Sequence, residues 1–152
     1  PNVFHGYLGD VESPFVEFEG RSWYRTGDLV REDEQGVFTF QGRLKRFIKR
    51  GGEMISLPAI EFVLLEHFGK GDSEDGPMLA VETIGEEARP EIVLCSTRDI
   101  SLQQANQVII GAHLSPLYKL DRVVRVDEIP VLGTGKTDYQ SLKRLLSATL
   151  VD

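Results

Sequence analysis

The sequence lacks the cysteines that an internal disulfide requires, because Cys95 is the only one. A single cysteine fits a reducing compartment, and its place in the apolar run 92–95 predicts a buried, unreactive thiol. No apolar run approaches the ~20 residues that a membrane-spanning helix needs. The sequence also shows no signal peptide. We therefore expect a globular, cytoplasmic protein.

An excess of positive charge is also missing. The chain carries 17 basic and 24 acidic residues, for a net charge of −7, which argues against general nucleic-acid binding. There is no initiator methionine: the chain begins with Pro1, which suggests a piece of a longer protein or a processed tag. The 152 residues are enough for one domain, or for one domain and part of another.

The sequence pattern changes near residue 43. Residues 1–43 alternate in short strand-like segments, with a hairpin turn predicted at 33–36. Residues 44–152 mix strand patterns with three helical stretches. The predicted starts of these helices are Ser56, Ser101 with Gln104 as a capping box, and Asp138. In the last helix the residues predicted to face inward are Tyr139, Leu142, Leu145 and Leu146. We predict an α+β fold, with a β-rich segment at 1–43 and a small mixed α/β domain at 44–152.

A glycine loop precedes the last predicted helix and contains Lys136. A phosphate-binding P-loop would need glycine where Pro130 stands, and proline lacks the amide donor and fixes φ. Two interpretations remain for the lysine. It is either a solvated turn residue or a mobile cation brought to a phosphate or carboxylate. At ~4 Å such a charge contributes about 4 kcal/mol at an effective dielectric constant of ~20.

A second group of charged residues lies between residues 28 and 50, far upstream of the Lys136 loop. Asp28 follows Gly27 in a turn and is either a plain β-turn residue or an acceptor for the hydroxyls of a vicinal diol. Arg43 is placed to clamp a phosphate or sugar nearby. The basic run comprises Arg43, Lys45, Arg46, Lys49 and Arg50.

This basic run has three possible interpretations. It is a solvated strand face, a nucleic-acid patch, or a docking surface for an acidic partner. Phe47 is its only aromatic residue, and nucleic-acid grooves interleave more aromatics with the positive charge. An acidic partner, steered to a local basic patch, is favoured.

Three motifs in this order resemble the adenylate-forming (AMP-binding) enzymes. They are the YRTGDL segment at 24–29, the GRLK segment at 42–45, and Pro130 with Gly135-Lys136. That superfamily includes acyl-CoA synthetases, peptide-synthetase adenylation domains and luciferases. More narrowly, residues 46–57 and 132–136 resemble the acyl-acyl carrier protein synthetase part of bifunctional 2-acylglycerophosphoethanolamine acyltransferases.

The resemblance implies a role for each part of the chain. Residues 1–43 would be the tail of the large N-terminal adenylation domain, and 44–152 the small C-terminal lid domain. The implied site residues are Lys136 as the catalytic residue, Asp28 and Arg43 for ATP or AMP, Lys45 as the hinge, Gly51, Gly52 and Glu53 as the thiol-carrier loop, and Arg46, Lys49 and Arg50 for carrier-protein docking. No metal ligand is expected in this chain.

The function implied is that of an ATP-dependent fatty acid–thiol ligase. It would form acyl-AMP and pass the acyl group to the phosphopantetheine thiol of acyl carrier protein. The alternatives are coenzyme A as acceptor, or a docking module without catalysis. ATP and Mg²⁺ would serve the longer protein, whose phosphate loop and acyl pocket do not occur here, so we expect the isolated chain to be inactive and to hold no cofactor alone. Acyl chain length, an upstream acyltransferase and attachment of the longer protein to the inner membrane stay open.

Overall fold

The computed structural model describes residues 5–6, 8–9, 12–69, 76–86 and 88–149. The chain divides into two compact units, Pro1–Lys45 and Arg46–Asp152. The change of sequence pattern predicted a division after residue 43.

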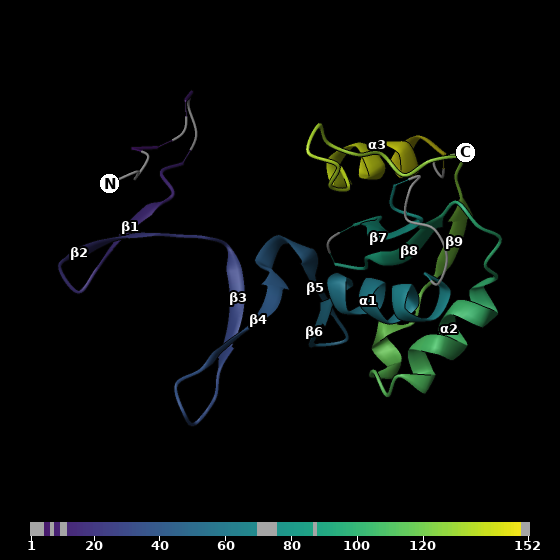
Figure 1. Cartoon of the computed structure of the whole chain (residues 1–152), viewed down its shortest axis with the longest axis horizontal. Helices are drawn as coiled ribbons and strands as arrows, with labels where there is room; N and C mark the ends of the chain where they lie inside the picture. Colours follow the sequence, from purple (N-terminus) through teal and green to yellow (C-terminus); the bar gives the residue numbers. More distant parts are fainter. Residues whose placement is uncertain (1–4, 7, 10–11, 70–75, 87, 150–152) are drawn as a thin grey trace. The chain divides into compact units, whose positions relative to one another are not determined.

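The first unit contains two antiparallel hairpins (Figure 1), namely β1 (Phe15–Phe18) with β2 (Arg21–Tyr24) and β3 (Asp28–Glu32) with β4 (Phe38–Arg43). The carboxylate of Asp33 accepts hydrogen bonds from the amides of Gln35 and Val37, both at 2.9 Å. These bonds shape the turn predicted at 33–36. In the described part of this unit no apolar side chain is buried. The strands therefore form without a core of their own.

The second unit is built on a three-stranded sheet with the order β7 (Leu79–Ile84), β8 (Glu91–Ser96), β9 (Arg122–Arg125). β7 and β8 are antiparallel, whereas β8 and β9 are parallel and are joined through α2 (Leu102–Gly111). Figure 1 shows α1 (Leu57–Phe68) and α2 on one side of the sheet and α3 (Tyr139–Thr149) on the other.

Two hydrophobic clusters follow the two faces of this sheet. Val81 and Leu94 pack with residues of α1 and α2, while Ala80 and Val93 pack with residues of α3. Successive side chains of a strand point to opposite faces, and both faces here are covered. This explains why β7 and β8 are almost continuously apolar in sequence rather than alternating.

Four short elements complete the second unit and its junction. They are η1 (Leu44–Arg46), β5 (Phe47–Arg50), β6 (Glu53–Ser56) and η2 (Pro116–Tyr118). β5 and β6 form an antiparallel hairpin. The mixed α/β fold with three α-helices and short sheets agrees with the predicted class.

Side-chain caps set the three helix starts, as predicted. Ser56 accepts from the amide of Ala59 at 3.2 Å, and Ser101 with Gln104 forms a reciprocal capping box. Asp138 accepts from the amide and hydroxyl of Ser141 at 3.1 and 2.7 Å. The side-chain and backbone hydrogen bonds from Ser141 lower the pKa of Asp138.

One inward-facing residue of the last helix was predicted wrongly. Leu142 and Leu146 are fully buried, whereas Leu145 is 38% exposed. Residues four apart lie on one face of a helix, and a residue one position away is rotated by about 100°. Leu145 therefore lies at the edge of the buried stripe.

Cys95 is fully buried, as predicted. Burial, with a smaller contribution from the charge of Glu82, raises the pKa of its thiol from the ordinary 9.0 to about 12. The thiol is thus neutral and shielded at physiological pH. None of the described helices has the length and apolar character required to cross a membrane.

Candidate functional site

Lys136 lies in a backbone-closed hairpin between β9 and α3. The base of the hairpin is an antiparallel bridge between Val131 and Thr137. One residue further out, the amide of Asp138 donates to the carbonyl of Pro130 at 2.8 Å. The loop is therefore anchored directly at the first turn of α3.

The tip of this hairpin is fixed by two more hydrogen bonds. The amide of Leu132 donates to the carbonyl of Lys136, and the amide of Gly135 to the carbonyl of Leu132, both at 2.8 Å. Gly135 has φ +79°, a left-handed conformation that glycine adopts without a Cβ penalty. The amides of Leu132 and Gly135 are therefore used inside the turn and are not available to a phosphate.

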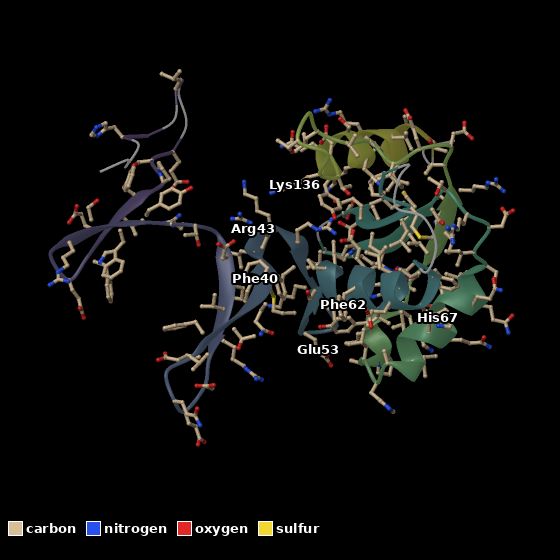
Figure 2. The ribbon with its side chains drawn as sticks, in the orientation of Figure 1. Phe40, Arg43, Glu53, Phe62, His67 and Lys136 are labelled. Carbon is tan, nitrogen blue, oxygen red and sulfur yellow. The ribbon has the colours of Figure 1, made fainter. Side chains whose placement is uncertain are left out.

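The side chain of Lys136 is exposed and projects from this loop (Figure 2). In the part of the chain that the structure describes, its ammonium forms no hydrogen bond or ion pair. The backbone of the loop is thus ordered by its own bonds while the charge at its tip stays available. This combination suits a cation presented to an anionic ligand.

Asp28 and Arg43 face each other across the β3–β4 hairpin of the first unit. They are register partners, and Arg43 Nη1 lies 2.8 Å from Asp28 Oδ1. The same nitrogen donates to the carbonyl of Thr26 at 2.8 Å. Asp28 Oδ1 is buried, and the neighbouring Arg43 guanidinium neutralises its charge as an ion pair.

The predicted thiol-carrier loop is the two-residue turn between β5 and β6. Arg50 pairs with Glu53 across it, and Gly51 and Gly52 have φ +58° and +86°. Positive φ at both positions is the type I′ geometry that favours glycine. A Cβ on Gly51 would lie 3.0 Å from Leu117 Cδ1. In Figure 2 Lys136 lies near α3 and Glu53 near the β5–β6 hairpin.

The structure removes Arg46 from the predicted docking set. Its side chain is 11% exposed and is paired with Glu61 at 2.7 Å and with Glu82 at 3.3 Å. A guanidinium held by two buried carboxylates cannot meet the surface of a partner. The sequence suggested a docking role because Glu61 and Glu82, the internal partners of Arg46, are distant in sequence and do not appear beside it.

Arg50 is also largely engaged. It pairs with Asp121 at 2.8 Å and donates to the carbonyl of Lys119 at 2.9 Å, which ties β5 to the segment before β9. Lys49 remains exposed, as does Lys45 at the predicted hinge. Most of the positive charge of the basic run is thus engaged in contacts within the chain.

Comparisons with known proteins identify chains that are similar in sequence and in fold. No protein-family model matches the chain. The medium-chain fatty-acid–CoA ligase of Escherichia coli K12 is 31% identical over 147 residues, 95% of this chain and 25% of the relative. Enterobactin synthase component E of the same organism is 29% identical over 153 residues, 97% of this chain and 27% of the relative. The chain thus spans about a quarter of the length of these relatives.

A solved fatty acyl CoA synthetase of Mycobacterium tuberculosis matches with a TM-score of 0.61 and 29% identity, over 88% of this chain and 26% of that one. The fold is that of the C-terminal domain of adenylate-forming enzymes. The similar proteins are acyl-CoA and AMP ligases.

Sequence reasoning missed the roles of Glu61 and Glu82 in the second unit, and it predicted Tyr139 only as an inward-facing residue. Glu61, Glu82 and Tyr139 surround Arg46, and Tyr139 donates its hydroxyl hydrogen to Glu61 Oε2 at 2.9 Å. Burial first, and then the charge of Glu61, raises the pKa of Tyr139 to about 12. The available signal was the presence of glutamates within apolar helix and strand patterns, where a charge needs a partner.

Proposed function

We propose that this chain is the C-terminal part of an ATP-dependent acid–thiol ligase that activates a fatty acid as acyl-AMP. The observation that carries the proposal is Lys136. It is an exposed cation with no ion pair among the described residues, on a backbone-closed hairpin in a fold shared with adenylate-forming enzymes. The proposed setting is the cytoplasm.

In adenylate formation, a fatty-acid carboxylate attacks the α-phosphorus of ATP and pyrophosphate leaves. Lys136 would approach the oxygens on which negative charge is concentrated, and preorganised cations stabilise such a transition state. Asp28 would accept hydrogen bonds from the ribose hydroxyls, with Arg43 beside it. The described residues contain no cluster of three metal-ligating side chains. ATP and Mg²⁺ are the cofactors that we propose for the longer protein.

The proposed acceptor is a phosphopantetheine thiol, which acyl carrier protein and coenzyme A share. The motif at residues 46–57 favours acyl carrier protein. The internal pairing of Arg46 and Arg50 reduces the predicted docking surface to Lys49. Coenzyme A is the alternative, supported by the similar CoA ligases. Thiol transfer with each acceptor, in wild type and Lys49→Glu, distinguishes them: only carrier-protein transfer should depend on Lys49.

Lys136→Ala tests the proposal in the full-length protein that carries this chain. ATP–pyrophosphate exchange should fall about 10²–10³-fold, the usual cost of losing one preorganised charge-stabilising group. Thiol transfer from supplied acyl adenylate should persist. Lys143→Ala, on the exposed face of α3, is the matched control and should change neither step.

Two outcomes would contradict the proposal. One is an equal loss of both steps in Lys136→Ala. The other is ATP–pyrophosphate exchange by the 152-residue chain alone, which lacks the phosphate loop and acyl pocket of such enzymes. Binding of a carrier protein by a full-length protein without any ligase activity would favour the docking-module alternative.

A further inference from the structure

Three side chains from three different elements surround the guanidinium of Arg46. We call Arg46, Glu61, Glu82 and Tyr139 the Arg46 cluster. Arg46 Nη2 lies 2.7 Å from Glu61 Oε1, and its Nη1 lies 3.3 Å from Glu82 Oε2. The guanidinium carbon lies 3.5 Å from the centre of the Tyr139 ring, a cation–π contact.

Glu61 joins the cluster to both neighbouring elements. Its Oε1 also accepts from the amide of Val81 on β7 at 2.7 Å, and its Oε2 accepts from the hydroxyl of Tyr139 on α3 at 2.9 Å. Arg46 donates to the carbonyl of Val81 at 2.9 Å. α1, β7, α3 and the start of the second unit are thus held by one hydrogen-bonded group.

The cluster is an expensive way to fill this space. The charged side chains of Arg46, Glu61 and Glu82 are 11–12% exposed, and taking such groups out of water costs several kcal/mol for each ion. Apolar side chains of similar volume often stabilise a protein as well or better. What charged groups add is a defined geometry, which suits a positioning role.

The two ends of the cluster have informative positions in the sequence. Arg46 is the first residue of the second unit and directly follows Lys45, the predicted hinge. Tyr139 directly follows Asp138, whose amide closes the Lys136 hairpin onto Pro130. Any displacement of the Tyr139 backbone is therefore passed to the base of that hairpin.

We propose that Arg46 and Tyr139 are positioning residues for Lys136, holding its hairpin in a fixed relation to the start of the second unit. The proposal rests on the proposed function of Lys136. The cluster would keep the hairpin at a fixed distance from Arg46, the residue that follows the predicted hinge Lys45. A shift of about 1 Å at a reacting group can cost ~10²-fold in rate.

Tyr139→Phe tests this in the full-length protein, because it keeps the ring over Arg46 and removes only the hydrogen bond to Glu61. The kcat of adenylate formation should fall about tenfold, while KM for ATP and thiol transfer from supplied acyl adenylate change less than about twofold. Tyr118→Phe, which removes another half-buried hydroxyl of the same unit, should alter neither. A kcat equal to wild type, or an equal loss of both steps, would overturn the proposal.

Amide hydrogen exchange in the 152-residue chain provides a readout that needs no activity. In Tyr139→Phe and Arg46→Gln the amides of Leu132, Gly135 and Asp138 should exchange about tenfold faster, because a buried hydrogen bond that holds the start of α3 is lost. The same amides should be unchanged in Tyr118→Phe. Unchanged exchange in both cluster variants would overturn the proposal, even if the full-length protein proved inactive. If exchange in the 152-residue variants were faster but the full-length protein had no ligase activity, the proposed ligase function would be refuted. The structural role of the Arg46 cluster would still hold.

Discussion

At the residue scale, burial gives similar side chains different roles. Arg46 and Lys49 are three positions apart, yet one lies among carboxylates inside the second unit and the other is exposed. The local sequence could not separate them, because the carboxylates that pair with Arg46 are distant in sequence. Glu61 lies on α1, 15 residues after Arg46, and Glu82 lies on β7, 36 residues after it. By contrast, Arg43 was expected near Asp28 as a phosphate or sugar clamp, and the structure adds the ion pair between them.

Burial of Cys95 and Tyr139 makes stability sensitive to alkaline pH. Their pKa values rise to about 12 from 9.0 and 10.0. Above pH ~9 the unfolded chain therefore binds fewer protons than the native one, and the free energy of unfolding falls as pH rises. Each group contributes at most about 1.4 kcal/mol per pH unit.

Urea titrations of wild type and Cys95→Ala at pH 8, 9 and 10 check this prediction. The variant should be less stable at pH 8, because a buried sulfur is lost, but its stability should fall less between pH 8 and 10. A fall of the same size in both proteins would show that Cys95 ionises equally in the folded and unfolded states.

At the element scale, local chemistry was sufficient wherever a structure depends on near neighbours. The turn at 33–36 and the helix starts at Ser56, Ser101 and Asp138 follow from side chains that bond backbone groups within a few residues. Packing between distant segments is where prediction stopped. The exposure of Leu145 and the Arg46 cluster depend on which elements meet, which periodicity alone does not fix.

The capping box of α2 gives a prediction at this scale. Ser101→Ala removes the acceptor for the amide of Gln104 and the partner of its side chain, so the free energy of unfolding should fall by about 1 kcal/mol. Gln103→Ala, exposed in the same first turn, is the control and should be neutral or slightly stabilising. Urea denaturation of both variants measures the difference. Equal stability of Ser101→Ala and wild type would argue against the cap.

At the scale of the whole molecule, the apolar core belongs to one unit. Every described buried hydrophobic side chain lies between Ile55 and Leu146, and isolated two-stranded hairpins are marginal in water. A chain of residues 46–152 should therefore unfold cooperatively, with a free energy within about 1 kcal/mol of the full chain. Residues 1–45 alone should show no cooperative transition. Circular dichroism during urea denaturation checks both, and loss of cooperative unfolding in 46–152 would contradict the prediction.

Internal pairing of the arginines also changes what an approaching molecule encounters. Charges within a Debye length of about 8 Å at physiological ionic strength act at long range as their sum. Arg43, Arg46 and Arg50 each lie beside a carboxylate, so they are close to electrically silent from outside. Of the basic run, Lys45 and Lys49 remain exposed, on a chain whose net charge is −7. This segment should therefore add little long-range attraction for an anionic partner, and recognition would rest on shape and short-range contacts.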